Sequence, residues 1–171
     1  MGIYNEKNLL QRSLILLEES NISESNKNII KEFKSYLIAT RIGVLRTNRY
    51  VIDLRLLCTR YKDKDFRKWT TKDVIEVLEK IEITDISENS KNEYQKSLKK
   101  FLKWLRGEDW EGLKFIHGKR RSYKKPDIIT KNEIIKLIEA AKHPRDKAMV
   151  ALLYEGGFRI GELASIRFKD I

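Results

Sequence analysis

One stretch limits the possible folds more than any other, because its apolar residues recur at a helical spacing. Between positions 90 and 106 they stand at i, i+4, i+7, i+8 and i+11, which places them on one face of an α-helix. That face consists of Tyr94, Leu98, Phe101, Leu102 and Leu105. Ser90 and Glu93 have the spacing of a capping box, so we expect this helix to begin there. With only eight glycines and two prolines in 171 residues, the sequence predicts an all-α protein.

Similar spacings predict more helices upstream of this one. A first helix is expected over residues 5–20, a second over 24–41 and a fourth after Trp69. The third is expected to start after Thr47, a good N-cap residue. The helices between 24 and 106 would form a four-helix bundle with an extra N-terminal helix, closed by Gly107. Cys58 is the only cysteine, which excludes an internal disulfide and suits a reducing compartment. It lies on an apolar helix face, so we expect it to be buried.

The charge of the chain predicts an anionic partner. Lys and Arg number 36 against 25 Asp and Glu, a net charge of +11, and nucleic acid is the commonest partner for such an excess. His117 and His143 are far apart and have no cysteine near them, so a metal site is not expected. No apolar stretch approaches the length of a membrane span, and no membrane partner is expected.

Three groups of basic residues are candidates for nucleic-acid contact. Lys96, Lys100 and Lys103 share one face of the predicted helix at 90–106, with Lys99 and Arg106 beside them. Arg46 and Arg49 flank Thr47, where a helix N-terminus and a hydroxyl donor suit a phosphate. A third group, within the predicted extended linker 118–126, precedes Pro126 and consists of Lys119, Arg120, Arg121, Lys124 and Lys125. For each group the alternative is a solvated surface, and the linker also has the composition of a nuclear localisation signal.

A tight corner is predicted near the end of the sequence. Gly156 and Gly157 follow an apolar helix and provide a left-handed C-cap, after which a second short helix starts near Arg159. The unpaired N–H groups of a new helix and the planar fork of a guanidinium both favour a phosphate. The alternative is a helix-terminal arginine that pairs with Glu155 or Glu162.

The residues of this corner resemble the first arginine box of the tyrosine recombinases, which include phage and archaeal integrases and Xer-type resolvases. The matching run is Gly157-Phe-Arg-Ile-Gly-Glu-Leu163, then Ile166-Arg167 and Asp170-Ile171. The resemblance assigns Arg159 to the first catalytic arginine and Glu162 to the acid that supports it. The family has a Thr-Gly pair where this chain has Gly156-Gly157, which is a mild departure. Looser matches upstream are Lys125-Pro126, Ile129 to Glu133 and Arg145 to Ala148.

This resemblance implies a domain organisation. Residues 1–21 would be an N-terminal helix, 22–117 the core-binding or SAM-like DNA-binding domain, 118–126 the basic interdomain linker and 127–171 the start of the catalytic domain. In the family, the second and fourth helices of the core-binding domain face DNA. Here these are the predicted helices that begin at Thr47 and Lys91.

The resemblance also implies a reaction. A tyrosine nucleophile would cleave a DNA strand to give a 3′-phosphotyrosyl link and a free 5′-hydroxyl, without metal or cofactor. The expected partner is double-stranded DNA in the cytoplasm, with self-association on DNA as a dimer or tetramer in the full-length protein. The family places a lysine, a His-x-x-Arg box and the nucleophile downstream of this point, so the 171 residues alone are expected not to cleave DNA. Leu152, Leu163 and Ile166 would then lack partners, which predicts loose packing or dimerisation.

Two other functions are compatible with the sequence. One is a helical DNA-binding regulator in which Gly156 to Arg167 forms a helix-turn-helix. The other is a protein-interaction bundle whose charge only keeps it in solution.

Overall fold

The fold was analysed in a computed structural model that describes residues 6–118 and 126–167. All regular elements within these ranges are helices, so the all-α prediction is confirmed. The chain divides into two compact units, one within Glu6–Arg121 and one within Ser122–Ile171. None of the described helices is long and apolar enough to cross a membrane.

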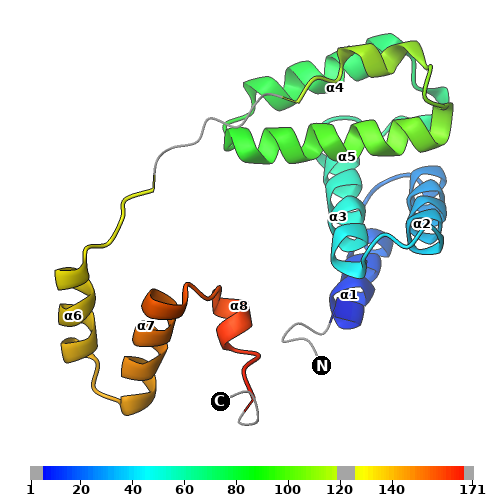
Figure 1. Cartoon of the computed structure of the whole chain (residues 1–171). Coiled ribbons are helices and arrows are strands. Elements are labelled where there is room, and N and C mark those ends of the chain that lie inside the picture. The colour runs from blue at the N-terminus through cyan, green and yellow to red at the C-terminus, as the bar shows by residue number, and fades with distance from the viewer. Residues whose placement is uncertain (1–5, 119–125, 168–171) are drawn as a thin grey trace. The chain divides into compact units, whose positions relative to one another are not determined.

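The first unit is a bundle built around its third and fifth helices (Figure 1). Its elements are α1 (Glu6–Glu18), α2 (Glu24–Ala39), α3 (Val44–Arg60), the short 3-10 helix η1 (Phe66–Lys68), α4 (Thr71–Ile83), α5 (Glu88–Arg106) and the 3-10 helix η2 (Glu111–Phe115). Helices α1, α2 and α5 all contact α3, while η2 packs on α4 and α5. The extra N-terminal helix α1 therefore packs within the same unit as the four helices that follow it. The predicted division into four segments stays a prediction.

Aromatic rings form the centre of this unit. The Phe33 ring lies 5.2 Å from that of Phe101, and Phe66 lies 4.7 Å from Phe101 and 5.0 Å from Trp69. All four side chains are buried, so Trp69, which directly precedes Thr70 and the fourth helix, anchors the start of that helix in the core. Cys58 is also buried as predicted, and this burial raises the pKa of its thiol.

Two predicted helix starts were wrong. Helix α3 begins at Val44, one turn before Thr47, with Gly43 as its N-cap. Helix α5 begins at Glu88, and the hydroxyl of Ser87 accepts a hydrogen bond from the N–H of Ser90 at 3.2 Å. In both cases an earlier capping position allows about one more helical turn, which adds backbone hydrogen bonds.

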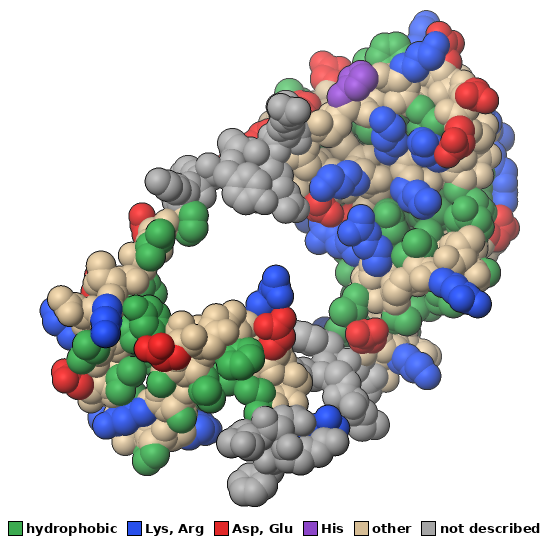
Figure 2. All heavy atoms as spheres, viewed as in Figure 1, with side chains coloured by type: hydrophobic (Ala, Val, Ile, Leu, Met, Phe, Trp, Pro, Cys, Tyr) green, Lys and Arg blue, Asp and Glu red, His purple; other side chains and the backbone are tan. Residues whose placement is uncertain are grey.

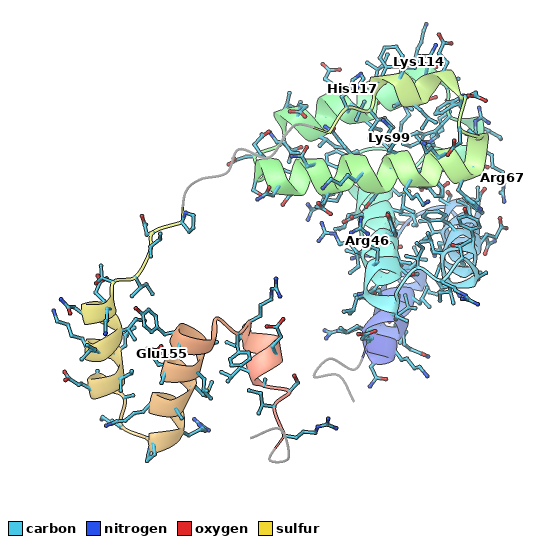
Figure 3. All side chains as sticks on the ribbon, in the orientation of Figure 1. Arg46, Arg67, Lys99, Lys114, His117 and Glu155 are labelled. Atoms are coloured by element: carbon cyan, nitrogen blue, oxygen red, sulfur yellow. The ribbon has the colours of Figure 1, made fainter. Side chains whose placement is uncertain are left out.

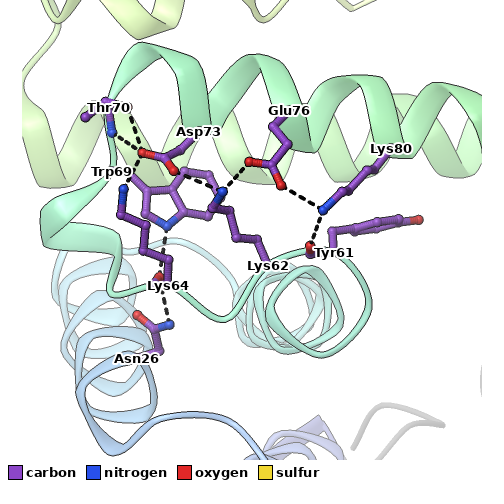
Figure 4. Close-up of polar contacts among 9 residues, drawn as sticks. All are labelled: Asn26, Tyr61, Lys62, Lys64, Trp69, Thr70, Asp73, Glu76 and Lys80. Carbon is purple, nitrogen blue, oxygen red and sulfur yellow. Dashed lines mark hydrogen bonds and ion pairs between the residues drawn. The ribbon is translucent and has the colours of Figure 1, made fainter.

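The connection between α3 and α4 is fixed by two buried polar side chains (Figure 4). The amide of Asn26 donates to the Asp63 carboxylate at 2.8 Å, and its oxygen accepts the Phe66 N–H at 3.0 Å. The Asp73 carboxylate accepts from Lys64 Nζ at 2.8 Å and from the Thr70 N–H at 2.7 Å. These bonds satisfy backbone and side-chain groups that the loop would otherwise bury unpaired.

Within residues 126–167 the second unit has three helices: α6 (Lys131–Ala140), α7 (Pro144–Gly156) and α8 (Ile160–Leu163). Helix α6 begins with a capping box, in which the Thr130 N–H donates to Glu133 at 2.8 Å and the Glu133 N–H donates to the Thr130 hydroxyl at 3.4 Å. Among the described hydrophobic residues of this unit, only Ile134 is buried. An apolar groove of about 320 Å³ lies open between α7 and α8. It is lined by Met149, Leu152, Ile160, Leu163, Ala164 and Ile166.

Candidate nucleic-acid interface and arginine corner

The corner between α7 and α8 has the backbone geometry expected from its two glycines. Gly157 follows the last residue of α7 with φ of +60°, so the predicted left-handed C-cap is confirmed. The ring of Phe158 folds over Gly156, and a Cβ atom at that glycine would lie 2.3 Å from the ring. The chain then enters α8 at Ile160, directly after Arg159.

Arg159 is held by a single carboxylate at this corner. Its backbone N–H donates to Glu162 Oε2 at 2.9 Å, and its Nη1 donates to Glu162 Oε1 at 2.9 Å. The backbone hydrogen bond and then the side-chain one lower the pKa of Glu162. The Arg159 side chain is nevertheless 87% exposed, and its other guanidinium nitrogens contact no acceptor in the described residues. The pairing of Arg159 with Glu162 fits both alternatives, the supporting role of Glu162 and a simple helix-terminal ion pair. It also leaves the Arg159 guanidinium open to a ligand.

In the first unit, helices α3 and α5 bring three predicted basic residues together. Arg46, Arg49 and Lys96 line one small cavity of about 40 Å³. The Arg46 guanidinium lies 5.9 Å from the centre of the Tyr50 ring, a cation–π distance. Figure 2 shows Lys and Arg side chains gathered across the middle of the viewed face of this unit.

The lysines of α5 differ in how they are engaged. Lys96 Nζ lies 2.8 Å from Glu93 and Lys103 Nζ lies 3.2 Å from Glu108. Both are surface ion pairs, which contribute little to stability and dissociate readily. Lys99 Nζ donates to the carbonyl oxygen of Ile116 at 2.9 Å, and so ties α5 to the segment after η2 (Figure 3). Lys100 has no partner among the described residues.

Two predicted contact residues, Thr47 and Arg106, are engaged within the fold. Thr47 is fully buried inside α3, with its hydroxyl 3.5 Å from the carbonyl oxygen of Ile42, so it cannot reach a phosphate. The reason is that α3 begins a turn earlier than predicted. The Arg106 guanidinium donates to the carbonyl oxygens of Arg67 at 2.8 Å and Trp69 at 3.0 Å, and lies 5.2 Å from the Trp110 ring. This engagement does not favour a DNA contact by Arg106.

The remaining predicted contacts are in the basic linker, and all five lie outside the described residues: Lys119, Arg120, Arg121, Lys124 and Lys125.

Sequence reasoning missed the groups that surround Arg49, above all Asp53 and Ser97. Asp53 follows Arg49 by one helical turn, and this i,i+4 spacing was a signal that could have indicated the pair.

Comparisons with known proteins found distant relatives of the chain. Over 149 residues, 85% of the chain, it is 28% identical to the tyrosine recombinase XerA of Pyrococcus horikoshii. Over 39 residues, 23% of the chain, it is 49% identical to transposase A from transposon Tn554 of Staphylococcus aureus. The chain covers 49% of XerA and 11% of the transposase. No family profile and no solved structure match it. The chain is thus distantly similar to a tyrosine recombinase.

Proposed function

We propose that the chain is the DNA-binding portion, with the start of the catalytic domain, of a site-specific tyrosine recombinase. The observation that carries this proposal is the corner at Arg159, where an exposed guanidinium follows a left-handed glycine and is held by Glu162. The distant similarity to XerA, which extends over 85% of the chain, supports the same origin for both units.

In the proposed reaction Arg159 donates to the non-bridging oxygens of the scissile phosphodiester. It stabilises the charge that develops in a phosphorane-like transition state, and Glu162 keeps the guanidinium in place. The attacking tyrosine and a second arginine come from the part of the parent protein after residue 171. Attack on the phosphorus breaks its bond to the 5′-oxygen, which leaves as a free 5′-hydroxyl, and the 3′-phosphotyrosyl link retains the bond energy for religation.

The proposed DNA-binding surface lies on α3 and α5. Arg46, Arg49 and Lys96 meet in one cavity, and Lys100 and Lys103 extend the surface along α5. Such a surface neutralises phosphates in a manner independent of sequence. Residues 22–117 would form this DNA-binding domain and 118–126 a linker that follows the DNA backbone, while 127–171 begin the catalytic domain. Self-association on double-stranded DNA would belong to the full-length protein.

The geometry of α8 does not favour the regulator alternative. A recognition helix places several side chains in the major groove. Helix α8 has only four residues, Ile160–Leu163, which is little more than one turn. The protein-interaction bundle has no comparable structural objection, and binding experiments distinguish it.

Two experiments test the proposed function. The affinity of the chain for double-stranded DNA is measured as a function of salt, where phosphate contacts predict a slope of log K against log salt of about −0.9 per contact. No binding at low salt, or a flat dependence, would contradict the DNA-binding proposal. The parent gene is then read beyond codon 171, where a His-x-x-Arg box and a later tyrosine are expected. Their absence would contradict the recombinase proposal but leave DNA binding intact.

A further inference from the structure

A fully buried carboxylate, Asp53, lies beneath the basic surface of α3 and α5. Its exposed fraction is 0%, and the hydroxyl of Ser97 on α5 donates to it at 2.6 Å. Arg49, one turn earlier on α3, donates to it through Nε at 3.0 Å. Burial raises the pKa of Asp53, while the hydrogen bond from Ser97 and the charge of Arg49 act in the opposite direction. Burial of a carboxylate lowers the stability of the fold, and a pair of uncharged side chains would join α3 and α5 at a lower cost in free energy.

The hydrogen bond to Asp53 uses only the inner nitrogen of the Arg49 guanidinium. A guanidinium has five N–H donors, so the four on Nη1 and Nη2 remain available. The hydrogen bond described for Arg49 comes from Nε, and the Glu93 carboxylate, which lines the same cavity, interacts with Arg49 through its charge. The Arg49 side chain is 48% exposed and lines the cavity that Arg46 and Lys96 also line. Its outer edge is therefore a fork of parallel donors, which matches a phosphate or the O6 and N7 atoms of guanine.

We propose that Asp53 is a positioning residue for DNA recognition, which fixes the Arg49 guanidinium so that Nη1 and Nη2 face a pair of acceptor atoms on DNA. Ser97 in turn fixes the carboxylate from the neighbouring helix. An arginine that is already held in its binding conformation loses less rotamer freedom on binding than a mobile one. This inference rests on the proposed DNA-binding function.

A purely electrostatic view predicts the opposite effect for loss of Asp53. Removal of a negative charge from beneath a basic surface strengthens attraction to a polyanion. If Asp53 positions Arg49, Asp53→Ala weakens binding instead, by about threefold to tenfold. Glu79→Ala on α4 is the matched control, because it removes the same charge from an exposed site away from the cavity. We expect its affinity to equal or slightly exceed that of the wild type.

The decisive experiment is a double-mutant cycle on the whole chain, with a random-sequence DNA duplex as the probe and fluorescence anisotropy at low salt as the readout. The partner variant is Arg49→Lys, which keeps the positive charge but lacks the fork. We expect Asp53→Ala and Arg49→Lys each to weaken binding, and the double variant to bind no more weakly than Arg49→Lys alone. The salt slope of a third variant, Arg49→Ala, which removes the charge, identifies the acceptor pair: a fall of about 0.9 indicates a phosphate, and an unchanged slope indicates a base edge.

Three outcomes separate this inference from the function on which it rests. No binding by the wild-type chain would overturn the proposed function itself. Binding by Asp53→Ala as tight as the wild type, or losses that add in the double variant, would overturn only the positioning role. Should Asp53→Ala fail to fold, the wild-type Arg49 Nε–H signal in NMR decides, because a held Nε–H exchanges slowly with solvent. Exchange as fast as that of an exposed arginine would then refute the inference.

Discussion

Replacement of three lysines on α5 is the sharpest perturbation of the proposed DNA-binding surface. Lys96, Lys100 and Lys103 share one face of α5, and two of them are engaged only in surface ion pairs, at 2.8 and 3.2 Å. Such pairs are worth at most about 1 kcal/mol, so DNA phosphates can replace the carboxylates. If each lysine contacts one phosphate, the triple alanine variant reduces the salt slope by about 2.7, which is about 0.9 for each contact. Affinity falls for all DNA sequences alike, because phosphates carry no sequence information.

The assay is fluorescence anisotropy of a labelled duplex across a series of salt concentrations. A control triple variant replaces Lys7, Lys34 and Lys72, which lie on α1, α2 and α4 and change the net charge equally. The salt slope of the control is expected to differ from that of the wild type by less than about 0.9, the value for one phosphate contact. Urea unfolding verifies that both variants are folded. Equal losses in the two variants would mean that net charge alone drives binding, and would refute the assignment of the surface to α5.

Three further predictions concern the fold that supports this surface. Asn26→Ala leaves the buried N–H of Phe66 without its acceptor and should lower the free energy of unfolding by about 3 kcal/mol in urea, with an unchanged m-value. Burial tends to raise the pKa of Asp73, but hydrogen bonds, with that from Lys64 the largest, lower it well below its usual range. Asp73 therefore stabilises the fold above the unfolded carboxyl pKa of about 3.9, and this stability is lost as pH falls towards the folded pKa. Asp73→Asn should cost about 2 kcal/mol at neutral pH and less in acid, and an equal cost at both would contradict the shift. Arg41 has φ of +61°, so Arg41→Gly should raise stability by about 1 kcal/mol, and a lower thermal midpoint would contradict this.

The helices and their buried faces could be predicted from the sequence because those signals are local. In α5, the residues Tyr94, Leu98, Phe101 and Leu102 are all buried, as their spacing indicates. The corner at Gly157 was also predicted, since only a left-handed residue continues the chain there without strain. The starts of α3 and α5 were wrong because each helix has two capping candidates in succession, and the helix extends to the earlier one, Gly43 or Ser87.

The roles of individual basic residues could not be predicted in the same way, because they depend on partners distant in the sequence. Arg106 looked like part of the basic stripe, but its guanidinium binds the carbonyl oxygens of Arg67 and Trp69 on the loop around η1. Asp53 has one local partner at an i,i+4 spacing, Arg49, but its other partner, Ser97, lies 44 residues away on α5. Composition predicts a basic surface, but it does not distinguish a Lys or Arg side chain that binds DNA from one that donates to the carbonyl oxygens of a loop.

The most direct test of the recombinase assignment is the formation of a covalent protein–DNA adduct by the full-length parent protein. The substrate is its recombination site with a nick that traps the cleaved strand, and the adduct is resolved on a denaturing gel. We predict that the parent protein accumulates a 3′-phosphotyrosyl adduct, whereas Arg159→Ala binds the same DNA with unchanged affinity and forms none. Adduct formation by Arg159→Ala at the wild-type rate would contradict the account, because the exposed guanidinium at the glycine corner would then have no part in the reaction.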